Sequence, residues 1–338
     1  MMLNFDAQRF LKIETGAVAL APGIHAAIGA CLAAGAGNIF FLGTGGAAIL
    51  MQPAALLLQR RSAFPAYMEI AAEFVAAGHQ GLGPRSIVVI PSLSGTTKES
   101  VETLEFCKAK GATIIALVGH QATPLGQKAD HVFVNFAEDD TSPESFYLQA
   151  LFIALSVMAH RGEFSDYDRT IAELASLPRH LLAAKQAFET EAERLATAFT
   201  AEPYHIVTAA GGSWPQAWYY GMCILEEMQW IRTRPVHAAD FFHGTLELVE
   251  KGVSVIIFHG EDAYRPLTER VEKFARQYTD KVTVLDTAGF AMDGISPDTR
   301  ALISPVILAT ILERLSAHLE VKRNHPLTTR RYYKKVSY

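Results

Sequence analysis

The sequence predicts an α/β protein in which helices alternate with the strands of a parallel sheet, and it predicts this plan twice along the chain. Short apolar segments rich in β-branched residues are followed by a turn and a helix-like segment between residues 38 and 160, and the same order returns after residue 204. Two doubly wound sheets in tandem are therefore expected, with a first domain over residues 1–165 and a second over residues 166–338.

The first half opens with a helical lead-in over residues 6–36 and then alternates strands with helices. Strands are predicted at residues 38–42, 67–70, 87–90, 113–118 and 131–135, and helices at residues 47–61, 97–110 and 145–160. The strand at residues 87–90 is entirely apolar, as is typical of a parallel strand that helices cover on both faces. In such sheets a ligand binds outside the carboxyl ends of the strands.

The second half follows the same plan after a long helical stretch over residues 167–200 that is interrupted at Leu177-Pro178. Strands are predicted at residues 204–209, 253–258 and 282–286, and helices at residues 214–230 and 263–278. The glycine turn at residues 210–213 repeats the arrangement seen after the first strand of the chain. The chain therefore contains a duplicated α/β unit.

A hydroxyl-rich loop directly follows the strand at residues 87–90. It consists of Ser92, Leu93, Ser94, Gly95, Thr96 and Thr97, and a helix opens after it. The N-terminus of a helix favours an anion, and hydroxyl and backbone N–H groups donate to phosphate oxygens. An ordinary N-capping turn is the alternative, but one cap needs one hydroxyl and this loop carries four. The loop is therefore predicted to bind a phosphate group.

Two further turns are candidates for the same edge of the first sheet. Gly43-Thr44-Gly45-Gly46 follow the first strand, although their spacing departs from the dinucleotide-binding fingerprint. Ser142 precedes a long helix, and with Pro143 after it a plain N-cap is the alternative. Gly43, Thr44, Gly45 and Ser142 are therefore candidate contacts of the same ligand. The corresponding strand exit of the second half, residues 257–262, carries no hydroxyl loop, so the second half is expected to have a different task.

Two residues of the second half are candidates for acid–base chemistry. Glu227 lies at the edge of the apolar face of the predicted helix over residues 214–230, where a carboxylate can act as a base; a solvated Glu226-Glu227 pair is the alternative. His243 follows two phenylalanines and precedes a glycine, which predicts a turn with a partly apolar surround. A surface imidazole is the alternative for His243, because the chain has 12 histidines.

Composition excludes several classes of partner. The formal net charge is −5 and no long basic run is present, which argues against nucleic acid and favours a small substrate. The three cysteines, Cys31, Cys107 and Cys223, have no paired spacing and are expected to be reduced, buried thiols in a cytoplasmic protein rather than disulfides or metal ligands. No signal peptide or membrane span is predicted. The Ala-rich residues 20–37 come closest to a membrane span in composition.

These segments together resemble the sugar isomerase domain proteins, which bind phosphosugars. The resemblance rests on Gly43-Thr44-Gly45 after a strand, the Ser-x-Ser-Gly-x-Thr loop at residues 92–97, the helix with Glu227, and the Asp-Phe-Phe-His-Gly segment at residues 240–244, and it spans nearly the whole chain. It implies two flavodoxin-like subdomains in tandem, similar to the isomerase half of glucosamine-6-phosphate synthase.

The resemblance also implies roles for individual residues. The family's phosphate-binding hydroxyls match Ser92, Ser94 and Thr97, with Thr44 and the backbone of Gly45 beside them. Its catalytic glutamate matches Glu227. Its histidine, which reaches across a dimer interface in relatives, matches His243, so a homodimer or higher homo-oligomer with shared active sites is implied. The family's chemistry needs neither a metal nor an organic cofactor.

Two departures from the aminosugar synthase separate this chain from a plain isomerase. Where that enzyme has a lysine one helical turn before the glutamate and another in the C-terminal tail, this sequence has Ile224 and Tyr332. The tail from Arg323 to Tyr338, with its Arg330-Arg331-Tyr332-Tyr333 run, instead resembles the ending of the fructoselysine-6-phosphate deglycases. Tyr332 is therefore a further candidate substrate contact.

The resemblance implies hydrolysis of a 6-phosphorylated sugar–amino acid adduct through an enaminol, with Glu227 removing the C1 proton. Three alternatives stay open. An aldose–ketose isomerase or aminosugar-phosphate deaminase would use the same two residues, and the absent lysines count against it. A non-catalytic phosphosugar sensor would keep only the hydroxyl loop, and a structural subunit would need neither site.

Overall fold

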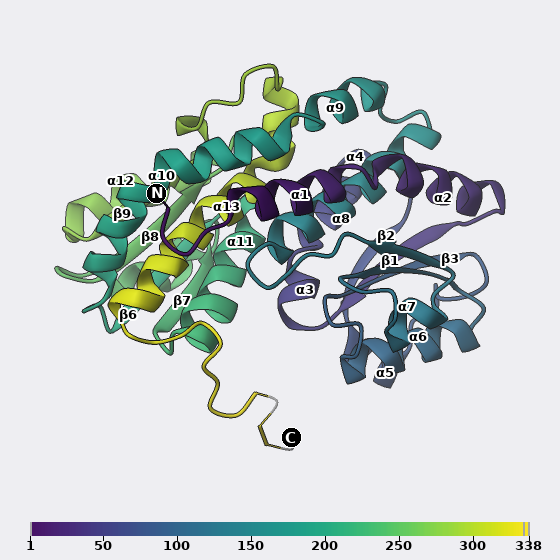
Figure 1. Ribbon diagram of the computed structural model, residues 1–338, viewed down its shortest axis with the longest axis horizontal. Coiled ribbons are helices and arrows are strands. Elements are labelled where there is room, and N and C mark those ends of the chain that lie inside the picture. Colours follow the sequence, from purple (N-terminus) through teal and green to yellow (C-terminus); the bar gives the residue numbers. More distant parts are fainter. Residues whose placement is uncertain (1, 334, 337–338) are drawn as a thin grey trace. The chain divides into compact units, whose positions relative to one another are not determined.

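The computed structural model describes residues 2–333, 335 and 336, so Met1, Lys334, Ser337 and Tyr338 of the predicted domains and tail lie outside the described residues. The described chain divides into two compact units (Figure 1). The first unit comprises residues 7–179, and the second comprises residues 2–6 together with residues 180–336. The sequence places the division between residues 165 and 166, whereas the first unit here also keeps the helix at residues 167–174.

The first unit contains a five-stranded parallel sheet in the order β2-β1-β3-β4-β5. Its strands are β1 (Asn38–Gly43), β2 (Ala66–Ile70), β3 (Ser86–Ser92), β4 (Thr113–Val118) and β5 (His131–Val134). Each strand predicted for this half is confirmed. The order is that of flavodoxin-like folds, in which the chain turns to the other side of the sheet between β1 and β3.

Helices cover both faces of this sheet. They are α1 (Ala7–Val18), α2 (Ala21–Ala33), α3 (Gly45–Ile49), α4 (Gln52–Arg61), α5 (Ala71–Ala77), α6 (Lys98–Ala109), α7 (Pro124–Lys128), α8 (Ser142–His160) and α9 (Tyr167–Leu174). Figure 1 shows α5, α6 and α7 on one face and α2, α4 and α8 on the other. All seven residues of β3 are buried, which explains the apolar run at residues 87–91 inside it.

The second unit repeats the plan with a four-stranded parallel sheet in the order β7-β6-β8-β9. Its strands are β6 (Tyr204–Ala209), β7 (Arg232–His237), β8 (Ser254–His259) and β9 (Val282–Asp286). Its longer helices are α10 (Leu177–Phe199), α11 (Trp214–Tyr219), α12 (Arg265–Tyr278) and α13 (Pro297–Lys322). Short turns of 3₁₀ helix lie at η1 (Gly211–Ser213), η3 (Phe241–His243), η4 (Thr245–Leu248) and η5 (Thr287–Gly289).

β7 and α13 were not predicted from the sequence. β7 is an edge strand in which the exposed residues Arg232 and Arg234 alternate with partly buried ones, among them Pro235. It therefore lacks a long apolar run. The helix predicted over residues 214–230 also differs from expectation. It is α-helical only to Tyr219 and continues as the π-helical segment η2 (Tyr220–Met228), whose wider turns change the directions in which its side chains point.

Two described helical stretches are long and apolar enough to cross a membrane by length and composition, namely residues 7–33 and α13. In α13, 89% of the apolar window is buried inside the protein, as expected of a core helix. Residues 7–33 lie near the N-terminus and consist of two helices, α1 and α2.

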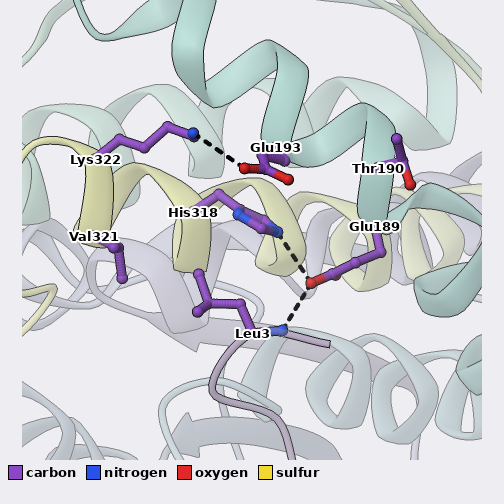
Figure 2. A pocket seen from close by; sticks show the side chains of 7 residues that line it. All are labelled: Leu3, Glu189, Thr190, Glu193, His318, Val321 and Lys322. Atoms are coloured by element: carbon purple, nitrogen blue, oxygen red, sulfur yellow. Dashed lines mark hydrogen bonds and ion pairs between the residues drawn. The ribbon is translucent and has the colours of Figure 1, made fainter. Parts of the chain in front are cut away.

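A charged cluster anchors the N-terminal residues to the second unit (Figure 2). The Glu189 carboxylate accepts hydrogen bonds from the Leu3 backbone N–H at 2.8 Å and from Arg314 Nε at 2.7 Å, and it lies 3.0 Å from His318 Nε2. Arg314 also donates to the Leu3 carbonyl at 2.6 Å and is completely buried. A cavity of about 470 Å³ lies beside this cluster and is lined by Leu3, Glu189, Thr190, Glu193, His318, Val321 and Lys322. Because its charged groups pair with one another, we regard the cavity as part of the anchor.

This cluster predicts a specific loss of stability in acid. Burial raises the pKa of Glu189, but the hydrogen bonds from Arg314, Leu3 and His318 outweigh it and lower the pKa from 4.5 to about 2. A depressed carboxyl pKa stabilises the fold above the unfolded value, and this contribution is lost as the pH falls from 4.5 towards 2. We expect a loss on the order of 1–3 kcal/mol after allowance for solvent screening.

Urea unfolding at pH 6 and at pH 3 measures this loss, with Glu189→Gln as the matched control. The free energy of unfolding of Glu189→Gln should fall less between the two pH values than that of the wild type. Equal pH dependence in both proteins would exclude Glu189 as the source.

Candidate functional site

The hydroxyl loop lies at the carboxyl end of β3 and is held by its own hydrogen bonds. Ser92, the last residue of β3, is 3% exposed; its Oγ lies 3.2 Å from Thr97 Oγ1 and accepts the Gly95 N–H at 3.1 Å. The Ser94 Oγ accepts from Thr96 Oγ1 at 3.1 Å. Ser94 and Thr97 are partly exposed, so their hydroxyls lie within reach of a ligand.

Thr97 occupies the N-cap position of α6, yet its side chain makes no capping hydrogen bond. Its hydroxyl lies against Ser92 instead. The capping alternative therefore does not account for this hydroxyl, and the N–H groups of the first turn of α6 are left without that cap. This arrangement suits an oxyanion at the positive end of the helix.

The residues that follow β4 hold the hydroxyl loop by backbone hydrogen bonds. The Gly119 N–H donates to the Leu93 carbonyl and the Leu125 N–H donates to the Gly95 carbonyl, both at 3.1 Å. Gly95 has a φ of 62°, and a Cβ on it would lie 2.2 Å from Thr123 Oγ1. Glycine is therefore required here both by its backbone conformation and by the close approach of Thr123.

Gly95→Ala should displace the hydroxyl loop, because the new methyl group overlaps Thr123 and the left-handed conformation costs about 1–2 kcal/mol. We expect binding of a phosphorylated ligand to weaken by about 10–100-fold, which corresponds to roughly 1.4–2.8 kcal/mol. The measurement is the inhibition constant of inorganic phosphate together with KM. Gly83→Ala is the control, since a Cβ there meets nothing within 4 Å; unchanged constants in Gly95→Ala would contradict the assignment.

The turn after β1 lies at the same edge of the sheet. β1 pairs directly with β3, so Gly43, Thr44 and Gly45 follow the strand next to the hydroxyl loop, at the point where the strand order reverses. Gly43 is buried, whereas Thr44 is exposed and its side chain makes no capping bond to α3. Gly45 has a φ of 59°. The structure therefore brings the two predicted turns of the first unit to adjacent strands.

Ser142 is placed less favourably as a ligand contact. It is the first residue of α8 and is buried, and its Oγ donates to the Asp139 carbonyl at 3.3 Å. Thr141, not Ser142, occupies the N-cap position, so the predicted N-cap is shifted by one residue. A substrate contact from Ser142 stays a prediction.

In the second unit, the loop that corresponds to the hydroxyl loop carries a carboxylate. The Asp262 carboxylate follows β8 and accepts the Gly212 and Tyr264 N–H groups, each at 2.9 Å. Burial raises the pKa of Asp262, and these two hydrogen bonds counteract the rise. A carboxylate that already accepts the backbone donors would repel a phosphate. This geometry supports the inference that the second unit has a different task.

Glu227 lies near the end of η2 and is paired with an arginine that the sequence analysis did not single out. The Arg330 Nε donates to Glu227 Oε1 at 2.9 Å, and the two side chains are 16% and 35% exposed, respectively. Glu226 is exposed and accepts from Thr233 Oγ1 at 2.7 Å. Glu227 is thus the more buried of the two carboxylates, as predicted, but its partner is a guanidinium rather than an apolar surface.

The C-terminal tail, residues 323–333, reaches η2 by several contacts besides this ion pair. Gln229 donates to the His325 carbonyl at 2.8 Å, and the Arg331 guanidinium lies 3.9 Å from the centroid of the Trp230 ring. Trp230 has a φ of 54°, which is uncommon for a residue other than glycine. The arginine pair at positions 330 and 331 was visible in the sequence, but nothing there indicated which arginine reaches the glutamate.

His243 and Tyr332 are both exposed. His243 ends the 3₁₀ turn η3, in which Phe241 is buried. Tyr332 is 67% exposed in the tail. A role for either residue stays a prediction.

The described residues include no group of three or more His, Cys, Asp or Glu side chains arranged to hold a metal ion. The three cysteines are free and buried. Burial raises the pKa of Cys107 and of Cys223 to about 12 and also raises that of Cys31. They are therefore protonated thiols at neutral pH and poor nucleophiles.

Comparison with known proteins links this geometry to one family. Residues 33–160 match the SIS domain model. The fructosamine deglycase of Bacillus subtilis (strain 168) is 32% identical over 310 residues, a match that covers 89% of this chain and 92% of that protein. The fructoselysine 6-phosphate deglycase of Escherichia coli (strain K12) is 27% identical over 312 residues, covering 92% and 90%, respectively.

A solved structure shows the same fold across both units. A candidate phosphosugar isomerase from Salmonella typhimurium LT2 superimposes with a TM-score of 0.86 at 27% identity. The match covers 95% of this chain and 97% of that one. The similarity therefore extends over both sheets and is not confined to the segment that the SIS domain model matches.

Proposed function

The chain belongs to the SIS-domain family that includes the fructosamine and fructoselysine 6-phosphate deglycases, and from that membership we propose that it is itself a deglycase. Its substrate is a 6-phosphorylated ketose joined through C1 to the amine of an amino acid, and its products are a hexose 6-phosphate and the free amino acid. The observation that carries the proposal is the 32% identity to a fructosamine deglycase over 89% of the chain.

The first unit supplies the phosphate contacts in this proposal. The hydroxyls of Ser92, Ser94 and Thr97 and the N-terminus of α6 bind the 6-phosphate. The partial exposure of Ser94 and Thr97 and the missing N-cap on α6 support this assignment. Thr44 and Gly45, after the neighbouring strand, contribute further donors.

The second unit supplies the proton transfers. Glu227 removes the C1 proton, so that the C1–C2 bond becomes the double bond of an enaminol. Protonation at C2 and loss of the N–H proton then give an aldose imine, and water hydrolyses its C1=N bond to release the amine and the hexose 6-phosphate. His243 assists ring opening or proton transfer to the sugar oxygens. General acid–base steps of this kind each contribute on the order of 10²–10⁴-fold.

The proposed enzyme is a cytoplasmic homodimer or higher oligomer. The exposed imidazole of His243 supports a role in the active site of a second copy, and the three free, buried cysteines support a reducing compartment. Gel filtration with light scattering tests the assembly. A strict monomer that is fully active would contradict the shared-site proposal.

The activity is tested with fructoselysine 6-phosphate, glucoselysine 6-phosphate and glucosamine 6-phosphate. We expect free lysine and glucose 6-phosphate in equal amounts from a lysine adduct, followed by an amine assay and by coupled oxidation of the glucose 6-phosphate. Ammonia from glucosamine 6-phosphate alone would favour a deaminase. If none of the three compounds releases an amine, the deglycase proposal is wrong and a phosphosugar sensor is favoured.

A further inference from the structure

The ion pair between Arg330 and Glu227 uses one of the two carboxylate oxygens of the glutamate. The Arg330 Nε donates to Oε1 at 2.9 Å. Among the hydrogen bonds of the described residues, none reaches Oε2. An oxygen that is free of donors is the better proton acceptor. Oε1 therefore holds the arginine, and Oε2 is the oxygen available to accept a proton.

Arg330 is itself held in place by the backbone of the tail. Its NH1 donates to the Leu327 carbonyl at 2.6 Å and to the Thr329 carbonyl at 3.0 Å. The guanidinium is therefore fixed at two of its nitrogens, one by the tail and one by Glu227. A planar group held in this way restricts the rotation of the carboxylate that it binds.

The tail does not depend on Arg330 for its attachment to the second unit. The Arg323 NH2 donates to the Gln229 carbonyl at 3.3 Å, Gln229 donates to the His325 carbonyl at 2.8 Å, and the Leu327 N–H donates to Glu320 Oε1 at 2.9 Å. The Arg331 guanidinium adds its contact with the Trp230 ring. Removing the Arg330 side chain should therefore leave the tail attached.

We propose that Arg330 is a positioning residue for the reaction, which orients the Glu227 carboxylate through Oε1 and leaves Oε2 to take the proton from C1. The proposal rests on the proposed function, because it assigns Arg330 to the glutamate that acts as base there. The C-terminal tail thereby contributes a residue that contacts the base.

The test compares Arg330→Met and Arg330→Lys with Arg331→Met, which changes the adjacent charge on the same tail. We expect Arg330→Met to lower kcat by about 10–100-fold with KM changed less than about threefold, because a contact to the base alone is lost. Arg330→Lys should recover part of kcat, and Arg331→Met should stay within about threefold of wild type.

Two further measurements separate this role from the alternatives. In the Glu227→Gln background, Arg330→Met should cause no additional loss, because both changes remove one unit. An additional loss, or a rise in KM with kcat unchanged, would show that Arg330 binds the substrate and would overturn the proposal.

A measurement without substrate distinguishes failure of this inference from failure of the proposed function. The ¹³C carboxyl resonance of Glu227 at pH 7, identified by its loss in Glu227→Gln, should change its chemical shift in Arg330→Met and not in Arg331→Met, because only the first variant removes the hydrogen bond to Oε1. An unchanged chemical shift in Arg330→Met would overturn the role of Arg330 even if the enzyme proves active. A changed chemical shift in a protein that releases no amine would support the contact between the two side chains and reject the deglycase.

Discussion

Glu227→Gln is expected to lower kcat by about 10²–10⁴-fold while the substrate still binds, because the amide cannot remove the C1 proton. Glutamine keeps the size of the side chain and an acceptor oxygen for the Arg330 Nε, so the local geometry should persist. Steady-state kinetics with the lysine adducts give kcat, and calorimetric titration of the variant gives the dissociation constant. A variant with wild-type turnover would remove Glu227 from the mechanism.

The adjacent glutamate provides the control for this experiment. Glu226→Gln changes the same chemical group one position earlier, but Glu226 is exposed, and its carboxylate bonds only to Thr233 among the hydrogen bonds of the described residues. Its kcat should stay within about twofold of wild type, since surface substitutions away from a site have small effects. Equal losses in both variants would point to disruption of η2 rather than to loss of a base.

Arg314→Met is expected to destabilise the protein by about 3–5 kcal/mol, because it removes one partner of a buried ion pair. Arg314 is 0% exposed and donates to Glu189 at 2.7 and 3.1 Å. The change also leaves the Leu3 carbonyl without its donor and so loosens the N-terminal residues. Urea unfolding at pH 7 measures the loss.

Arg194→Met is the matched control for Arg314→Met. Arg194 also pairs with a glutamate, Glu191, at 2.6 Å, but its side chain is 64% exposed. An exposed pair contributes about 0–1 kcal/mol, so this variant should unfold close to wild type. A loss below about 1 kcal/mol in Arg314→Met would contradict the view that the buried cluster anchors residues 2–6.

The predictable parts of the fold are those with a local physical signal. The central strands β1, β3, β4 and β8 were found because each carries an unbroken apolar run of at least four residues, and the structure buries these runs. β7 was missed because an edge strand needs no such run. The π-helical turns of η2 were missed because no pattern in residues 220–228 distinguishes them from an ordinary helix.

The candidate site was predictable to the same extent. The hydroxyl loop was identified because four hydroxyl residues exceed what one helix cap needs, and in the structure Thr97 provides no side-chain cap. Glu227 was favoured over Glu226 by its place on the helix, and the burial of the two side chains agrees. His243 is exposed, and the apolar surround predicted for it stays a prediction.

Local sequence patterns therefore sufficed to predict the two doubly wound sheets and the loop at residues 92–97, because apolar periodicity and turn residues act between close neighbours. The folded chain was needed to show that the Asp262 carboxylate accepts the Gly212 N–H and that Arg330 pairs with Glu227. These contacts join residues 50 and 103 positions apart in the chain. Polar groups so far apart in the chain meet only after the backbone has folded, so no local pattern could identify them as partners.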